Sequence, residues 1–187
     1  MAAVPRPTRA ALEAARSLTV PDLLPGPDDP PCAVLFCGIN PGLVTALTGH
    51  HFGRPGNRFW PALHLGGFTP RRLLPAEQGE LPALGLGITN MVQRATARAD
   101  ELTDTELRTG GERLRALVAR VRPRWLAVVG ITAYRVAFDA PRAAVGPQDA
   151  VLGATRVWLL PNPSGLNAHW QLPELAAEFA RLRAAAG

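Results

Sequence analysis

Two polar turns contain the side chains of this chain that are best suited to chemistry. One follows the apolar run at residues 33–38 and contains Asn40, and the other follows the apolar run at residues 157–160 and contains Asn162 and Ser164. In an open parallel sheet, ligands bind in the crevice at the carboxyl ends of the strands. If both runs are parallel strands, the two turns border one site.

The first turn, Gly38-Ile39-Asn40-Pro41-Gly42, can hold an amide rigidly. Pro41 has a fixed φ and keeps Asn40 extended, while Gly38 and Gly42 allow a ligand to approach the backbone. The turn matches neither the dinucleotide-binding fingerprint nor the P-loop. Asn40 is therefore a candidate catalytic residue, and an Asx-turn that only shapes the loop is the alternative.

The loop at residues 49–60 combines histidines, aromatic rings and arginines. It contains His50, His51, Phe52 and Arg54 within a few positions of one another. Such a mixture suits the stacking of a base and the binding of phosphates. Adjacent histidines also occur in metal sites, but no carboxylate or cysteine stands nearby at ligand spacing, so we expect no metal.

The second turn carries a leucine at its tip, in the segment Ser164-Gly165-Leu166. Leucine gains nothing from exposure to water, so Leu166 is either an apolar wedge that enters a base stack or a residue that packs under the last helix. Ser164 together with His169 would suit nucleophilic catalysis, but no Gly-x-Ser-x-Gly elbow surrounds Ser164.

The elements that must position these turns alternate between strands and helices. Short apolar runs predict buried parallel strands at residues 33–38, 84–91, 125–130 and 156–160. Helical spacing, a capping box and Pro173 predict helices. These lie at residues 58–65, from residue 103 to Pro123, after the strand at residues 125–130 as far as Tyr134, and from residue 173 onward. This alternation predicts a three-layer α/β/α sandwich around a short, mostly parallel sheet of about four strands.

The chain of 187 residues fits one domain behind an N-terminal arm. Residues 1–31 contain seven prolines and predict an extended arm with a short helix at residues 8–16, and residues 32–187 are expected to form the single domain. We expect no membrane span and no signal peptide, because the apolar runs are too short. Cys32 and Cys37 fit no metal motif, and a reduced, cytoplasmic protein is the simplest expectation.

The charge balance is basic, with a net charge of +5, and all twenty basic side chains are arginines. A basic balance favours nucleic acid as a partner. Because the chain contains no lysine, no side-chain amine can form a Schiff base with a substrate.

Three motifs together resemble a known family. Residues 38–42, the segment Asn57-Arg58-Phe59-Trp60 and residues 162–166 resemble the mismatch-specific uracil/thymine DNA glycosylases of the uracil-DNA glycosylase superfamily, in the same order across roughly residues 32–185. The resemblance implies an enzyme that flips uracil out of a duplex, usually from a G·U mismatch, and hydrolyses its N-glycosidic bond.

The resemblance also implies roles for individual residues. Asn40 would orient the attacking water, Phe52 would stack on the flipped base, and Gly165-Leu166-Asn167 would form the wedge that fills the vacated space. The substrate-binding positions would be Gly38, Ile39, Phe52, Asn57, Asn162 and Ser164. Ala168 follows the wedge, at a position where some relatives carry an arginine. The lack of this arginine would weaken binding to the opposite DNA strand.

The expected chemistry depends on an amide rather than a carboxylate. An amide is no strong base, so Asn40 can position water but hardly deprotonate it. The reaction would then depend on bond cleavage to an oxocarbenium-like sugar and a uracil anion that backbone donors stabilise. Asp100, beside Glu101, could add the missing carboxylate as a catalytic residue. The alternative, that Asp100 belongs to the solvated entry of the next helix, is preferred.

We therefore expect a monofunctional, cofactor-free DNA glycosylase of base-excision repair that acts as a monomer on double-stranded DNA containing G·U mismatches. Two main alternatives stay open. One is a mismatch-binding module without turnover, and the other is a small-molecule hydrolase that uses Ser164 and His169. A nucleotide-binding regulatory domain would need a glycine-rich fingerprint, which the sequence lacks.

Overall fold

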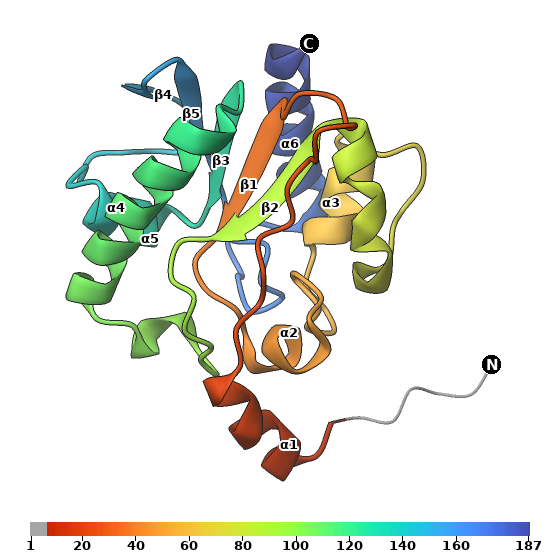
Figure 1. Ribbon diagram of the computed structural model, residues 1–187, viewed down its shortest axis with the longest axis vertical. Helices are drawn as coiled ribbons and strands as arrows, with labels where there is room; N and C mark the ends of the chain where they lie inside the picture. The colour runs from red at the N-terminus through yellow and green to blue at the C-terminus, as the bar shows by residue number, and fades with distance from the viewer. Residues whose placement is uncertain (1–6) are drawn as a thin grey trace.

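A five-stranded sheet in the order β2-β1-β3-β5-β4 forms the centre of the fold (Figure 1). The computed structural model describes residues 7–187, and residues 1–6 of the predicted arm lie outside the described residues. Four strands run parallel, namely β1 (Val34–Gly38), β2 (Leu86–Asn90), β3 (Trp125–Val129) and β5 (Thr155–Leu160).

The parallel strands are apolar because helices cover both of their faces. Every residue of β1, β2 and β3 is buried, and Arg156 is the one exposed residue of β5. A strand that is buried on both sides needs apolar residues at successive positions rather than at alternate ones. The continuous apolar runs of the sequence therefore predicted these strands correctly.

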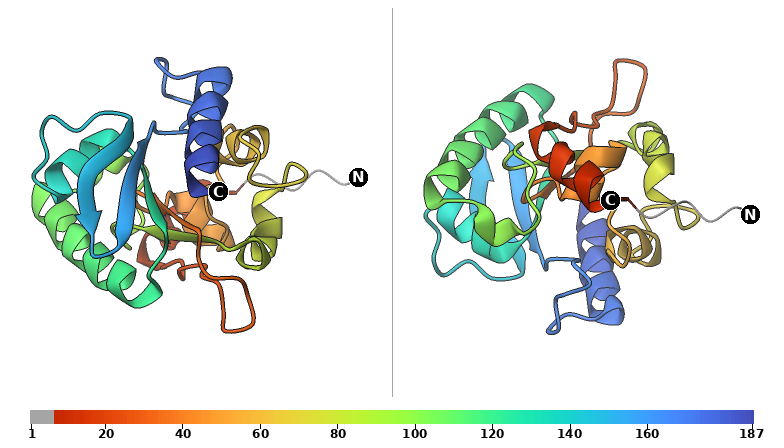
Figure 2. Two further views of the ribbon diagram at one scale, coloured as in Figure 1. Left: turned by 90° about the horizontal axis from the view of Figure 1, so that it is seen from above. Right: turned by 90° about the horizontal axis from the view of Figure 1, so that it is seen from below.

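Two helices pack on each face of the sheet (Figure 2). Helices α3 (Phe59–Leu65) and α6 (Leu172–Ala186) cover one face, where Phe36 of β1 meets Phe59 edge-on with ring centroids 5.4 Å apart. Helices α4 (Asp104–Val121) and α5 (Ile131–Ala137) cover the other. The predicted three-layer α/β/α sandwich is confirmed.

The capping box predicted for α4 is confirmed. The Glu106 N–H donates to Thr103 Oγ1 at 3.2 Å, and the Thr103 N–H donates to Glu106 Oε2 at 2.9 Å. The helix ends at Val121, and its C-cap Arg122 adopts a left-handed φ of 52° immediately before Pro123. The capping box thus fixes the start of the helix that covers β1 and β3, and Pro123 fixes its end.

The sheet has one strand more than the sequence predicted. Strand β4 (Gly146–Leu152) pairs antiparallel with β5 at the edge of the sheet, and most of its residues are exposed. An exposed edge strand gains little from apolar side chains, and this one contains Pro147, Gln148 and Asp149. Its sequence therefore resembles a loop, which is why the strand was missed.

The N-terminal segment continues onto the sheet. Helix α1 (Arg9–Ala14) lies near α2 (Leu43–Thr48), at the edge of the sheet where β1 ends (Figure 1). Farther on, Leu23 forms an antiparallel bridge with Ile88 of β2. Asp22 accepts a hydrogen bond from Thr89 at 2.6 Å and pairs with Arg113 at 2.8 Å.

The remaining elements are short 3₁₀ helices. The 3₁₀ helices are η1 (Ala15–Ser17), η2 (Pro75–Glu80), η3 (Pro82–Leu84) and η4 (Ala99–Glu101).

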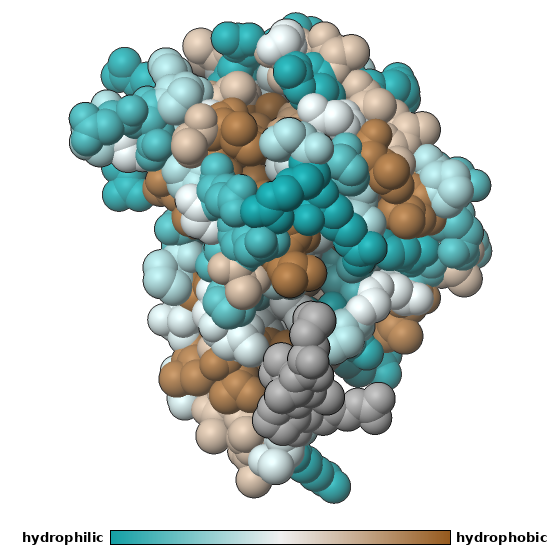
Figure 3. Space-filling model, turned by 90° about the vertical axis from the view of Figure 1, so that its right-hand side faces the viewer, coloured by the Kyte–Doolittle hydropathy of each residue, from teal (hydrophilic) through white to brown (hydrophobic). Residues whose placement is uncertain are grey.

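On the face seen in Figure 3, hydrophobic residues lie in separate patches among hydrophilic ones. Among residues 7–187, no helix combines the length and apolar character needed to cross a membrane.

Candidate active site

A cavity of about 500 Å³ lies at the carboxyl ends of the parallel strands. The turns after β1 and β5 both border it, as predicted from the two asparagine turns. Nine predicted site residues line it, namely Gly38, Ile39, Asn40, Phe52, Asn57, Asp100, Asn162, Ser164 and Leu166. Gly165 lines a smaller adjoining hollow. Asn167 lies next to it, where its side-chain amide donates to the carbonyl of Asn162 at 3.0 Å.

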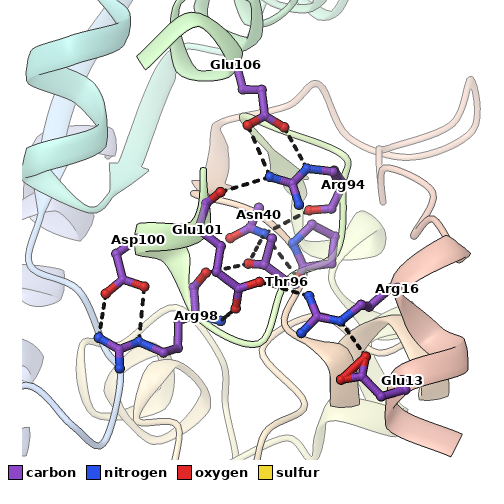
Figure 4. Close-up of polar contacts among 10 residues, drawn as sticks. Glu13, Arg16, Asn40, Arg94, Thr96, Arg98, Asp100, Glu101 and Glu106 are labelled. Atoms are coloured by element: carbon purple, nitrogen blue, oxygen red, sulfur yellow. Dashed lines mark hydrogen bonds and ion pairs between the residues drawn. The ribbon is translucent and has the colours of Figure 1, made fainter. Parts of the chain in front are cut away.

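The amide group of Asn40 is held by its nitrogen. Its Nδ2 donates to the Thr96 hydroxyl at 2.7 Å and to the carbonyl of Arg94 at 2.8 Å (Figure 4). The Thr96 hydroxyl donates its own proton to the carbonyl of Arg98 at 2.7 Å, so it can only accept from Asn40. Within residues 7–187 no donor is bonded to the Asn40 oxygen, which leaves Oδ1 free to accept a proton of a water molecule.

Ion pairs hold the loop that binds Asn40 (Figure 4). The Arg94 guanidinium binds the Glu106 carboxylate at 2.6 and 3.1 Å and the carbonyl of Glu101 at 3.0 Å. The hydrogen bond from Arg94 lowers the pKa of Glu106 to about 2, so the pair stays ionised around neutral pH. Arg16, which follows α1, pairs with Glu101 at 2.8 Å. The loop at residues 94–101 is thereby fastened to α4 and to the N-terminal segment.

Phe52 presents an aromatic face to the cavity. Its ring stacks on Phe59 with centroids 3.9 Å apart and planes inclined by 15°. Phe52 has a φ of 52°, a left-handed conformation that costs free energy for a residue with a side chain. Such strain persists where surrounding contacts impose it, and here it places the ring beside Gly38. A planar ligand can stack on the face that Phe59 leaves open.

Asn90, which sequence analysis missed, forms part of the cavity lining at the end of β2. It is 6% exposed, and its Oδ1 occupies the space above Gly38, where a Cβ atom would lie 2.6 Å from that oxygen. Its Nδ2 lies 3.5 Å from His51 Nδ1. One signal was available, since Asn40, Asn90 and Asn162 all stand at or just after the end of a strand.

His51 sets the orientation of the Asn90 amide. Its Nε2 lies 3.0 Å from the carbonyl of Pro21, which can only accept, so the ring proton sits on Nε2. Burial lowers the pKa of His51 despite the opposing effects of the Pro21 carbonyl and of Asp22. The neutral ring accepts from Asn90 through Nδ1, and Asn90 therefore turns its oxygen toward the cavity.

Of the predicted residues Asp100, Ser164, Leu166 and His169, the first three line the cavity, and His169 is not among its lining residues. Leu166 is 75% exposed, so it does not pack beneath the last helix. The Asp100 carboxylate is bound by the Arg98 guanidinium, with 3.1 Å between Nε and Oδ1. In the described part of the chain, no hydrogen bond joins Ser164 to His169, and the Ser164 hydroxyl accepts the N–H of Leu166 at 3.3 Å. Nor do three or more metal-binding side chains gather anywhere in that part.

The fold and the site together form a cavity at the carboxyl ends of the strands that is lined by the aromatic ring of Phe52 and by the amides of Asn40 and Asn90. The family model of the uracil DNA glycosylase superfamily matches residues 25–185, and the chain belongs to this superfamily. Membership implies DNA as the substrate, and an activity of the uracil DNA glycosylase type that hydrolyses N-glycosyl bonds.

Thr96→Val tests the support of Asn40. Valine fills the same space but cannot accept from Nδ2, so the amide is free to rotate away from the orientation that offers Oδ1 to water. We expect single-turnover uracil release to slow roughly ten- to a hundredfold, as for a misplaced catalytic group, with unchanged DNA affinity. Thr105→Val, at an exposed position of α4, is the matched control. A normal rate for Thr96→Val would show that Asn40 needs no such support.

Proposed function

We propose that this protein is a monofunctional glycosylase that removes uracil from G·U mismatches in double-stranded DNA and so begins base-excision repair. The observation that carries the proposal is the free Oδ1 of Asn40, which lies in a cavity that also contains an aromatic face. The cavity opens beside the exposed Leu166, on a chain that belongs to the superfamily. The enzyme would act as a monomer without a cofactor.

The flipped base would be recognised by stacking and by one hydrogen-bond acceptor. Uracil would lie on Phe52, with its N3–H directed at the Asn90 oxygen that His51 orients. Cytosine has an unprotonated N3 at this position, which the same oxygen would repel. Ile39, Asn57, Asn162 and Ser164 would line the remaining walls of the pocket.

Bond cleavage would lead the reaction. Asn40 would place a water molecule for attack on the sugar, but an amide cannot take up its proton during the attack. The N-glycosidic bond would therefore break first, and uracil would depart as an anion that pocket donors stabilise. The water would then add to the oxocarbenium-like sugar and lose its proton to the uracil anion or to solvent. Asp100 lines the cavity and is the carboxylate that the sequence offered as a catalytic candidate. Because Arg98 binds it, we expect Asp100 to contribute to the rim of the cavity rather than to proton transfer.

The product would be an intact abasic site. Cleavage of the strand by a glycosylase requires an amine that forms a Schiff base with the opened sugar, and this chain has no lysine to supply one. The Leu166 wedge would hold the duplex open while the base occupies the pocket. Extrusion costs a few kcal/mol and is least unfavourable at a mismatch, which fits a preference for G·U pairs.

One experiment tests the whole proposal. The protein is incubated with the same uracil-containing strand alone, paired with guanine opposite uracil, and paired with adenine opposite uracil. We expect release from the single strand and from G·U, less from A·U, and strand breaks only after alkali. Binding without release would identify a mismatch-binding module, and equal rates on G·U and A·U would contradict mismatch selectivity.

Asn40→Ala tests the proposed catalytic residue. Removing the amide leaves the attacking water without its acceptor, so we expect single-turnover release to fall by roughly two orders of magnitude or more. Binding to an uncleavable G·U analogue should stay unchanged. If this variant keeps the wild-type rate, Asn40 only shapes its turn and the mechanism is wrong.

A pH series tests the proposed role of His51. Its pKa lies below the ordinary value, so the ring is neutral at neutral pH and becomes protonated as the pH falls through that lowered pKa. Protonated Nδ1 can no longer accept from Asn90, the amide turns, and uracil loses its acceptor. We expect release from G·U to fall about tenfold per pH unit on the acid side of that pKa.

His51→Gln is the control for this series. The glutamine side chain does not titrate, so the acid limb should disappear from the profile even if the overall rate is lower. An acid limb that persists unchanged in the variant would assign the titration to another group.

Leu166→Ala separates a glycosylase that opens duplexes from one that needs an unpaired base. Leucine offsets part of the unstacking free energy by filling the gap that the base leaves. We therefore expect a clear loss of activity on duplex G·U and little change on single-stranded uracil, where no stack must be opened. Equal losses on both substrates would mean that Leu166 supports the fold instead.

A further inference from the structure

One arginine binds the wedge loop, residues 163–170, along its whole length. The backbone N–H of Arg58 donates to the carbonyl of Pro163 at 2.9 Å. Its side chain donates to the carbonyl of Trp170 at 2.7 Å, to that of Asn167 at 2.8 Å, and to that of Ser164. A single residue at the start of α3 thus holds both ends of the loop and its middle.

The exposed tip of the loop lies between two of these contacts. Leu166 is 75% exposed and stands between Ser164 and Asn167, whose carbonyls both accept from the guanidinium. Among residues 7–187, its side chain belongs to none of the hydrophobic core clusters. The position of Leu166 depends on the backbone on either side of it, and Arg58 fixes that backbone.

A glycine contact holds the loop from the other side. Gly165 lies so close to Gly56 that a Cβ on Gly165 would come within 2.8 Å of the Gly56 carbonyl oxygen. Gly56 itself has a left-handed φ of 83°. The wedge loop therefore lies directly on the turn that precedes Arg58, with no side chain between them.

The chemistry of arginine suits this arrangement. The guanidinium is a planar group with several fixed donors, whereas the lysine ammonium is a point charge on a flexible chain. Bonds from a charged donor to carbonyls are stronger than neutral ones. The Nε of Arg58 is buried without a hydrogen-bond partner among residues 7–187, so the group engages its surroundings through its two terminal nitrogens.

We propose that Arg58 is the positioning residue of the DNA wedge, and that it sets how well the enzyme opens a duplex. The inference rests on the proposed function. A wedge offsets the free energy of unstacking only if its own ordering does not cost the same amount during the reaction. Arg58 orders the loop in the free protein. Without it, the enzyme keeps its base pocket and its chemistry but prefers uracil that is already unpaired.

Arg58→Lys is the first test, by single-turnover release from duplex G·U and from the same strand without its complement. We expect a loss of about tenfold or more on the duplex, where a stack must be opened, and a rate within about twofold of wild type on the single strand. Arg124→Lys is the matched control, because Arg124 also donates to a main-chain carbonyl, that of Ala186, but lies outside the cavity. Equal losses on both substrates would overturn the assignment and leave Arg58 with a structural role.

A double variant distinguishes positioning of the wedge from any other effect on duplex DNA. If Arg58 acts through Leu166, then Arg58→Lys combined with Leu166→Ala should be no slower on the duplex than Leu166→Ala alone. Losses that add in the double variant would overturn the proposal. Gly165→Ala serves if Arg58→Lys folds poorly, because its Cβ displaces the loop from the Gly56 side and should give the same selective loss on duplex DNA.

A fluorescence measurement separates this inference from the proposed function. With 2-aminopurine next to uracil in the duplex, unstacking is followed in the Asn40→Ala background, where no base is released. Arg58→Lys should reduce the increase in fluorescence that binding causes, and an unchanged increase would overturn the inference. A wild-type chain that unstacks the duplex but releases no uracil from any substrate would instead overturn the proposed function while the positioning role stands.

Discussion

The hydrogen bond between Asn40 Nδ2 and the Thr96 hydroxyl is the interaction on which the site depends. An asparagine amide ends in two groups of opposite hydrogen-bonding character, an NH₂ group that donates and an oxygen that accepts. Only the oxygen can accept a proton of water. Thr96 and the Arg94 carbonyl bind the nitrogen of Asn40, and this orientation directs the oxygen of the amide toward the cavity. Their loop is in turn held by the pair of Arg94 with Glu106, so the cap of α4 also supports Asn40.

Sequence patterns revealed what local rules determine and missed what depends on distant contacts. Continuous apolar runs predicted the parallel strands, and proline-flanked turns predicted Asn40 and Asn162 at one cavity. Strand β4 is exposed at the edge and has no such pattern. Asn90, His51 and Arg58 act through partners across 30 or more residues, such as the contacts from His51 to Pro21 and from Arg58 to Asn167. No local spacing encodes these pairs.

The N-terminal segment supports the site from outside the region that matches the superfamily. That region begins at residue 25, yet the carbonyl of Pro21 determines which nitrogen of His51 carries the proton, and through His51 which face of Asn90 meets the cavity. Arg16 likewise pairs with Glu101 in the loop that holds Asn40. The base recognition and water positioning that we propose would therefore both depend on residues that precede the matched region.

In the proposed mechanism, slow cleavage of the N-glycosidic bond leads to a preference for mismatched base pairs. If the flipped base returns to the stack faster than its bond breaks, the observed rate is the flipped fraction multiplied by the rate of cleavage. The difference in opening free energy between G·U and A·U then appears fully in the rates. A stronger general base would commit each flipped base to cleavage and erase that difference. In this mechanism an amide at position 40, with the Asp100 carboxylate bound to Arg98, would give selectivity at the expense of speed.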